Sequence, residues 1–154
     1  MRGIPQIYYG TEIQMSHPGT DSHGAIRAEF PGGWPDHDSN AFTGEGLSDE
    51  QRAAQEMTRD LLQWRGQADV IHNGKLMQFT PMDNVYAYFR YDDDDTVMVI
   101  FNLGDDEIEV DTARFAERLQ GATAATNVLS GEVTDIDGSI ELPPRSVLLL
   151  DIND

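Results

Sequence analysis

Carboxylates lie close together in two segments where their spacing could serve a metal ion. Residues 92–95 are four successive aspartates, and Asp135-Ile136-Asp137-Gly138 is similar to the start of a calcium loop. Calcium sites alternate their ligands with spacer residues and end on a glutamate, which neither segment supplies. Aspartate runs and Asp-Gly pairs between apolar segments are typical of tight hairpin turns. We therefore predict hairpin turns at both positions.

Three histidines lie among acidic residues in the N-terminal third of the chain: His17, His23 and His37. A zinc site needs a compact ligand spacing, and these histidines match none of the standard patterns. Phosphate-binding loops, dinucleotide fingerprints and nucleophile elbows are also absent from the sequence. We predict structural or solvated histidines, with no metal and no cofactor.

Aromatic residues in the same region offer a different chemistry. Tyr8, Tyr9, Phe30 and Trp34 lie near acids and near Arg27. Such a mixture suits a sugar ring, which has apolar faces and hydroxyl edges. Packing in a core is the alternative for each of these aromatic side chains.

The elements that would position these residues follow the order strand, long loop, helix. Residues 4–9 form an apolar run that is typical of a buried parallel strand, and residues 10–47 show no sustained periodicity. Ser48 and Gln51 have the spacing of a capping box. The helix predicted from there, over 48–65, ends before Gly66. Its apolar stripe is Ala53, Ala54, Met57, Leu61 and Trp64.

After Gly66 the periodicity changes from helical to alternating, so we place a domain boundary between residues 66 and 67. The strands predicted there are 69–72, 75–80, 84–91, 96–102, 106–110, 124–129, 132–136, 139–142 and 145–152. One helical turn is predicted within 111–119. Short, closely spaced strands of this kind predict an antiparallel β-sandwich, so the fold class is mainly β.

The composition is strongly acidic: 28 Asp and Glu against 10 Lys and Arg give a net charge of −18 in 154 residues. Such a surface disfavours nucleic acid and anionic membranes as partners. Nine of the ten bases are arginine. Acidity with so little lysine is typical of proteins from a high-salt cytosol, and an ordinary acidic protein is the alternative. No signal peptide, membrane span or cysteine is found, which leaves the compartment open.

A family resemblance is carried by the first residues of the chain. Residues 2–13, Arg-Gly-Ile-Pro-Gln-Ile-Tyr-Tyr-Gly-Thr-Glu-Ile, closely resemble the motif at the eighth barrel strand of α-amylase-family glycoside hydrolases. Phe30-Pro31-Gly32-Gly33-Trp34 and Asn40-Ala41-Phe42 are similar to the neopullulanase and cyclomaltodextrinase branch. Residues 70–75, 85–90 and 142–146 resemble that branch's C-terminal β-domain.

The resemblance implies that residues 1–66 are the last βα unit of a (β/α)8 barrel and that residues 67–154 are the C-terminal β-sandwich. It implies an α-glucan-acting hydrolase that cleaves α-1,4 or α-1,6 links with retention. The family's catalytic carboxylates follow earlier strands of the barrel, so we assign no catalytic residue and expect this chain alone to be inactive. The motif positions are Gly3, Pro5, Tyr8, Tyr9, Gly10 and Glu12, with Glu12 as a positioning residue.

The family's loop after this strand holds sugar hydroxyls with an aspartate and an arginine. The nearest matches are Asp21 and Arg27, at a wider spacing, and we expect Trp34 to join them in binding substrate. An ion pair of Arg27 with Glu29 or Asp36 is the alternative role for that arginine. The partner is then an α-glucan or maltooligosaccharide.

Two further expectations concern the chain as a whole. An apolar strand without barrel neighbours would pair with a second copy, so self-association through residues 4–9 is expected. A stand-alone carbohydrate-binding or structural sandwich is the alternative to a hydrolase fragment, although such a module has no need of an apolar parallel strand at its start.

Overall fold

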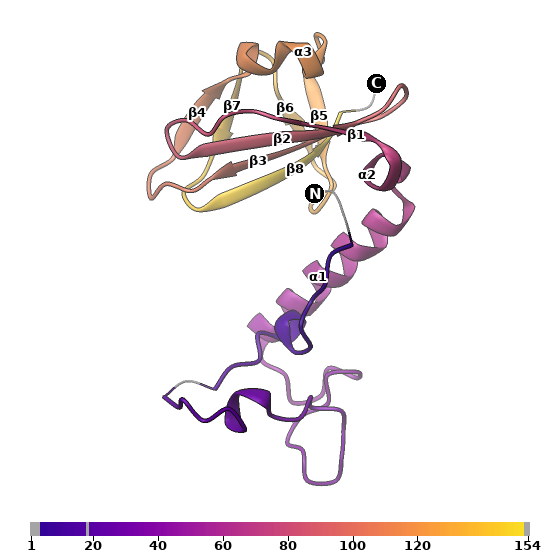
Figure 1. Ribbon diagram of the computed structural model, residues 1–154, viewed down its shortest axis with the longest axis vertical. Coiled ribbons are helices and arrows are strands. Elements are labelled where there is room, and N and C mark those ends of the chain that lie inside the picture. The colour runs from indigo at the N-terminus through magenta and orange to yellow at the C-terminus, as the bar shows by residue number, and fades with distance from the viewer. Residues whose placement is uncertain (1–3, 18, 153–154) are drawn as a thin grey trace. The chain divides into compact units, whose positions relative to one another are not determined.

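The computed structural model describes residues 4–17 and 19–152 (Figure 1). Contacts within the chain divide it into two compact units. We name Ile4–Leu62 the loop unit, and the part that begins at Gln63 the sandwich unit. Among the described residues, no helix is long and apolar enough to cross a membrane.

Antiparallel strands build the sandwich unit, as predicted (Figure 1). Their bounds are β1 Lys75–Gln78, β2 Val85–Tyr91, β3 Thr96–Asn102, β4 Ile108–Asp111, β5 Ala124–Asn127, β6 Val133–Asp135, β7 Ser139–Leu142 and β8 Ser146–Asp151. One sheet has the order β1-β2-β3-β8-β5-β6, and β4 pairs with β7 in a second sheet. The predicted helical turn is confirmed by a 3-10 helix, Thr112–Phe115, followed by α3, Ala116–Leu119.

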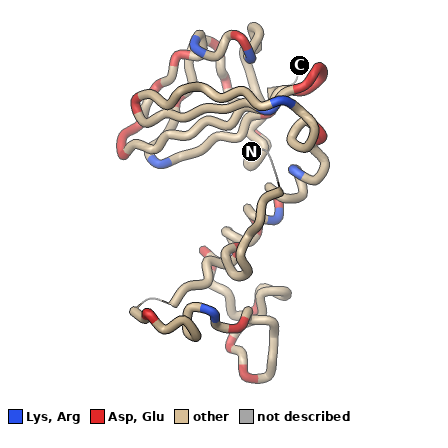
Figure 2. Tube along the Cα trace, in the orientation of Figure 1, with Lys and Arg blue, Asp and Glu red and all other residues tan. Residues whose placement is uncertain are grey.

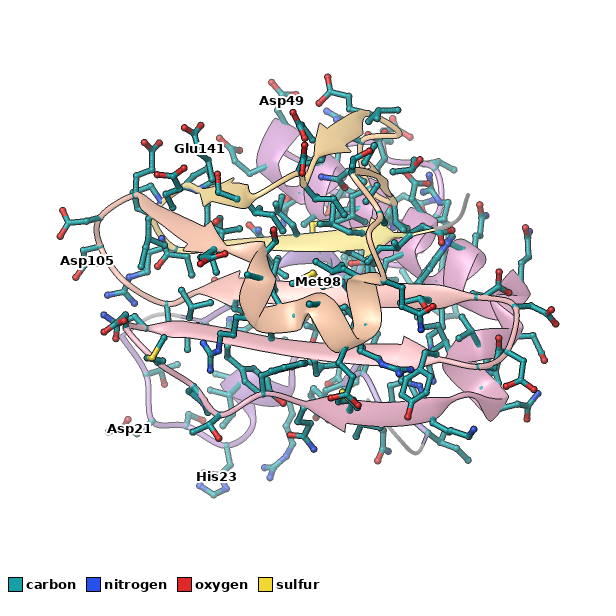
Figure 3. All side chains as sticks on the ribbon, turned by 90° about the horizontal axis from the view of Figure 1, so that it is seen from above. Asp21, His23, Asp49, Met98, Asp105 and Glu141 are labelled. Carbon is teal, nitrogen blue, oxygen red and sulfur yellow. The ribbon has the colours of Figure 1, made fainter. Side chains whose placement is uncertain are left out.

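The two sheets share one apolar core. Phe89 of β2 lies opposite Met98 of β3, and both are fully buried beside Leu142 of β7. Successive side chains of a strand alternate between the two faces of its sheet, which sends every second side chain of these strands inward. Figure 3 shows Met98 in the interior, whereas Asp105 and Glu141 point outward.

The acidic tract between β2 and β3 is a hairpin turn, as predicted, and acidic segments lie at other turns of the sandwich unit as well (Figure 2). Oδ1 of Asp92 accepts hydrogen bonds from the N–H groups of Asp95 (2.8 Å) and Asp94 (3.0 Å). These bonds hold the pKa of the Asp92 carboxyl below its usual value. In the described parts of the chain, no three His, Asp or Glu side chains are grouped so that they could hold a metal ion.

One strand and one hairpin predicted in the sandwich unit were wrong. Residues 69–72 were expected to form a strand, but they belong to helix α2, Asp69–Asn73, in which Val70 and Ile71 are both buried. The side chain of Asn73 donates to Asp69 at 2.7 Å, one helical turn away. An apolar run this short fits a buried helix as well as a strand.

The second error concerns Asp137-Gly138. These residues were expected to close a hairpin, but β6 pairs with β5 whereas β7 pairs with β4. The turn therefore carries the chain from one sheet to the other. Ile136 is buried, and its N–H donates to the carbonyl of Thr123 at 2.9 Å, so the segment is anchored before it crosses.

Helix α1, Asp49–Gln67, begins at the predicted capping box. The N–H of Ser48 donates to Oε1 of Gln51 (3.0 Å), and the N–H of Gln51 donates to Oγ of Ser48 (3.2 Å). The helix continues through Gly66, where it was expected to stop. None of its residues is buried in this structure, so the predicted apolar stripe is incompletely covered, and Met57 is exposed.

Candidate functional site

The first described segment of the loop unit departs from the predicted strand. Residues 4–10 form no strand, and Ile4 is 97% exposed. A parallel strand needs hydrogen-bonding neighbours on both sides, and the described residues offer none to this segment. Pro5, Tyr8 and Tyr9 are likewise exposed. Gly3, the first of the predicted motif residues, lies outside the described residues.

A tight turn follows at Gly10. Its φ is +85°, and a Cβ there would lie 2.8 Å from the Cβ of Met15, so the turn requires glycine. The carbonyl of Gly10 accepts from the N–H groups of Met15 (2.8 Å) and Ile13 (3.3 Å). Ile13 is buried with Ala41 and Leu47 in a small core. Glu12 is half-buried in the 3-10 helix Thr11–Ile13 that this turn begins.

A hollow of about 180 Å³ opens beside this turn. Its lining residues are Tyr8, Tyr9, Thr11, Met15, Ser16, His17 and Ile26. The Tyr8 and Tyr9 ring centroids are 4.6 Å apart, and the Tyr9 hydroxyl donates to the carbonyl of Ala28 at 3.0 Å. The hydrogen bond with Tyr8 raises the pKa of the Tyr9 hydroxyl, which favours its protonated, donating form. The hollow combines apolar walls with hydroxyl groups, as a sugar site does.

Arg27 ends the 3-10 helix Ala25–Arg27 close to this hollow. Its Nη1 donates to the carbonyl of His23 at 3.2 Å, and its positive charge acts on Tyr9. Within the described residues it forms no ion pair with Glu29 or Asp36; Glu29 faces His37 instead. The exposed guanidinium thus has further N–H donors for a ligand.

Asp21 was predicted to act beside Arg27, but in the described parts of the chain no hydrogen bond or ion pair joins the two side chains. Asp21 is exposed. Its side chain points away from the backbone into solvent, as that of His23 does (Figure 3). A shared role of Asp21 and Arg27 would therefore depend on a ligand that meets both.

Trp34 belongs to an exposed aromatic surface within the loop unit. It is 66% exposed, and Phe42 is 80% exposed. A Cβ placed on Gly32 would lie 3.5 Å from the ring of Phe42 and 3.8 Å from Nε1 of Trp34, so the two side chains flank this glycine. The ring of Phe30 packs against Phe42 with centroids 5.6 Å apart. Two large aromatic faces are thereby left open to solvent.

The backbone around this aromatic surface is held by turn contacts. The N–H of Ala41 donates to the carbonyl of Pro31 (2.8 Å), and the N–H of Asn40 donates to the carbonyl of Glu45 (2.7 Å). Gly33 has a φ of +82°, and a Cβ there would lie 2.3 Å from Nδ2 of Asn40. Only glycine allows this close approach.

His37 has a structural role, as predicted. Its Nδ1 accepts from the N–H of Gly32 at 3.2 Å, and its Nε2 lies 3.6 Å from Oε2 of Glu29. It therefore supports the segment that carries Trp34. His17 lines the hollow beside Tyr8, a position that sequence spacing did not indicate.

Sequence reasoning missed other residues of the site. Met15 and Ile26 line the hollow, and Phe42 widens the aromatic surface. Phe42 could have been predicted from the sequence, because it belongs to the Asn-Ala-Phe segment that resembles the family. Met15 and Ile26 carried no signal, since a loop without periodicity does not reveal which side chains meet.

The sandwich unit matches a known family. Residues 76–151 fit the model of the cyclo-malto-dextrinase C-terminal domain. Residues 76–151 therefore match a C-terminal domain of α-amylase-family glycoside hydrolases, and the predicted resemblance is confirmed over this part of the chain.

Solved structures with the same fold are α-amylase-family enzymes. AmyP in complex with maltose matches at a TM-score of 0.67 and 21% identity, over 94% of this chain and 30% of that one. The α-amylase from Geobacillus thermoleovorans, complexed with acarbose, matches at 0.62 and 17%, over 99% and 30%. The debranching enzyme of Nostoc punctiforme matches at 0.59 and 18%, over 96% and 26%. The chain thus spans less than a third of the length of each of these proteins.

Proposed function

We propose that this chain is the C-terminal part of an α-glucan-acting glycoside hydrolase, whose complete form cleaves α-1,4 or α-1,6 glucosidic links with retention. The observation that carries the proposal is the extent of the structural likeness. It covers 94% of the chain in the maltose complex of AmyP, so it includes the loop unit as well as the sandwich unit. A free sandwich module would account for the second unit alone.

Residues 1–66 are, on this proposal, the end of a (β/α)8 barrel, and residues 67–154 are its C-terminal domain. The exposed apolar segment 4–9 supports this division, because its side chains and backbone suit a strand that is paired within a larger protein. Active sites of such barrels lie at the carboxyl ends of their strands, where the loop after residue 10 would begin.

The loop unit then contributes to substrate binding, and the catalytic carboxylates come from other parts of the hydrolase. Arg27 donates hydrogen bonds to sugar hydroxyls, Trp34 presents an aromatic face to a sugar ring, and Asp21 accepts from a hydroxyl of the same ligand. Glu12 positions the turn that follows Gly10. The neutral hydroxyl of Tyr9 holds the carbonyl of Ala28, next to Arg27.

The test is Arg27→Ala in the full-length hydrolase. We expect kcat/KM on long α-glucans to fall by roughly 10- to 100-fold, because a guanidinium that binds hydroxyls of a reacting substrate contributes about 1.4–3 kcal/mol. The melting temperature should not change, since Arg27 is exposed and its side chain donates to the carbonyl of His23, a contact within one turn of chain. Arg59→Ala, an exposed arginine of α1, is the matched control. Unchanged kinetics, or a loss that follows a fall in stability, would contradict the assignment.

Self-association through residues 4–9 is a second proposal, for the chain by itself. Ile4 and Ile7 expose apolar surface beside an unpaired backbone, which favours pairing with another copy. We expect the mass of the chain, measured in solution by light scattering, to rise with concentration. Ile4→Lys with Ile7→Lys should restore the monomer. A wild-type chain that stays monomeric at every concentration would contradict the proposal.

A high-salt environment is the third proposal, and it rests on the net charge of −18 with a single lysine. Repulsion among the acids destabilises a compact chain unless salt screens it.

A further inference from the structure

The outer face of the large sheet carries aromatic side chains that the core does not use. Tyr86 of β2 lies opposite Phe101 of β3, and Phe101 lies opposite Val147 of β8. Two residues further along the strands, Tyr88 lies opposite Val99, and Val99 lies opposite Leu149. The neighbours of these residues in sequence, such as Ala87 and Ile100, point into the core.

Exposure along this face changes from one end to the other. Val99 and Leu149 are buried, whereas Val147 is 38% exposed and Leu103, just beyond β3, is 57% exposed. Helix α2 lies at the covered end, where Nη2 of Arg90 donates to the carbonyl of Ile71 at 2.9 Å. Within the sandwich unit, one end of the face is therefore covered, whereas the end with Tyr86 and Phe101 is half-buried.

The rings at the half-buried end are nearly parallel. The planes of Tyr86 and Phe101 differ by 18°, with centroids 6.0 Å apart. Tyr88 and Phe101 differ by 29° at 6.4 Å. The hydroxyl of Tyr86 donates to Oε1 of Gln78 at 2.8 Å, which fixes the ring and leaves the amide N–H₂ group of Gln78 for another partner.

A hollow of about 550 Å³ adjoins these rings. Its lining residues are Gln78, Phe79, Thr80, Pro81, Tyr86 and Leu103. The lining has no ionised side chain, although the chain carries 38 charged residues. Strands β2 and β3 contain no acid, and Figure 2 shows the acidic segments at the turns around them. The ligand that this lining fits is neutral, with apolar faces and with hydroxyl groups for Gln78 and Thr80.

We propose that this hollow and the rings of Tyr86 and Phe101 form a non-catalytic site for an α-glucan segment. A glucose ring offers C–H faces to the aromatic side chains and hydroxyl edges to the two polar ones. The volume lies within the range of sites for small ligands, about 300–1,000 Å³, and holds a few sugar rings. An anionic ligand is disfavoured by the net charge of −18. The choice of an α-glucan among neutral sugars rests on the proposed function.

The site would hold a polymeric substrate on the sandwich unit while another part of the enzyme cleaves it. It therefore predicts binding that can be separated from catalysis. Removing it should weaken the action of the full-length hydrolase on insoluble starch and leave its action on maltotriose unchanged.

The experiment titrates the 154-residue chain with maltoheptaose and follows aromatic signals by NMR. We expect saturable shifts at Tyr86 and Phe101, with a Kd on the order of 1 mM. Tyr86→Ala should weaken binding, followed at the remaining Phe101 signals, at least about tenfold, because it removes the stacking ring. Leu103→Glu, which adds a charge beside the hollow without touching the core, should do the same. Val133→Ala, at an exposed residue of β6, is the control and should leave the Kd unchanged.

Three results would overturn the proposal. The first is that the shifts are confined to the loop unit, and the second is that no saturable binding occurs up to about 10 mM maltoheptaose. The third is that the chain forms a dimer which Leu103→Glu dissociates, because this face would then be a protein interface. Each of them leaves the proposed function standing, because the Arg27→Ala test measures catalysis by the full-length hydrolase and this titration does not.

Discussion

The two units of this protein differ in how completely each can bury its own apolar residues. In the sandwich unit Phe89, Met98 and Phe115 are fully buried, and each strand of the large sheet has a neighbour supplied by the same unit. In the loop unit the core consists of Ile13, Ala41 and Leu47, while Ile4 and several aromatic side chains lie open to solvent. An antiparallel sheet closes within one stretch of chain, whereas a parallel strand depends on segments far away.

Polar groups show the same difference. Asn102 of β3 is buried, and its Nδ2 lies within hydrogen-bond distance of the carbonyls of Asp106 (2.8 Å), Pro143 (2.9 Å) and Leu142 (3.2 Å). The contacts with Leu142 and Pro143 join segments about forty residues apart in sequence. The turns of the loop unit bond mostly over three to ten residues, as Met15 does with Gly10. Long-range bonds make unfolding cooperative, so we expect the sandwich unit to melt as one body.

The largest effect should come from a core residue of the sandwich unit. Phe89→Ala should lower the free energy of unfolding of that unit by about 3–5 kcal/mol, because it leaves a cavity among fully buried side chains. Ile13→Ala, the matched change in the loop unit, should leave the melting of the sandwich unit unchanged. Instead it should speed the hydrogen exchange of the Met15 and Leu47 N–H groups. Calorimetry and hydrogen exchange measure the two effects.

A different result would break the comparison. If Ile13→Ala lowered the melting temperature of the sandwich unit as much as Phe89→Ala does, the two units would unfold as one cooperative body. The loop unit would then be as well supported as the sandwich unit, despite its small core.

The sandwich unit was predictable for the reason that makes it self-contained. Its strands are short alternating or wholly apolar runs joined by local turns, so residues 96–102 and 139–142 could be assigned with the bounds that the structure has. The errors lie where local pattern is insufficient. Val70 and Ile71 fit either element, and Asp137-Gly138 gives no sign of which sheet the next strand joins.

The candidate site was predictable only through resemblance. The residues around Tyr8 and Trp34 were found because their order resembles a family motif. The contacts that these residues make could not be predicted in this way. In a loop whose apolar residues show no periodicity, turns such as those at Gly10 and Gly33 bring side chains together. The amino-acid composition does not indicate where these turns lie. The strand at 4–9 failed for a physical reason: its pattern predicts burial that only other segments of a protein can provide.

Salt should act more strongly on the sandwich unit. Residues 63–154 carry eighteen acids and six bases, a net −12, whereas residues 4–62 carry ten acids and three bases, a net −7. The Debye length falls from about 10 Å at 0.1 M salt to about 3 Å at 1 M, which screens this repulsion. We expect molar potassium chloride to raise the melting temperature of the sandwich unit by about 5 °C, on the order of 1 kcal/mol.

Charge-neutralising variants sharpen this prediction. Asp93→Asn with Asp94→Asn, in the exposed turn between β2 and β3, should reduce the dependence on salt. Asp36→Asn with Asp38→Asn, in the loop unit, should reduce it less. A melting temperature that is flat or falls as salt rises would remove the proposal of a high-salt environment.

The smallest effect concerns the start of α1, the one helix that begins in the loop unit and ends in the sandwich unit among the described residues. Ser48→Ala removes the acceptor for the Gln51 N–H, and it should destabilise the first turn by about 0.5–1 kcal/mol. The pKa of Glu50 is lowered by its own backbone N–H and by the Ser48 side chain, so the variant should raise that pKa toward its usual value. A group whose pKa is lowered by folding contributes stability above its unfolded pKa and loses it as the pH falls through its folded pKa.

The stabilisation from Glu50 should therefore be present at neutral pH, disappear on acidification below its usual pKa, and be smaller in Ser48→Ala. NMR titration of Glu50 measures the pKa, and hydrogen exchange at residues 50–52 measures the fraying. A Glu50 pKa that is the same in both proteins would show that Ser48 caps the helix without acting on this carboxylate.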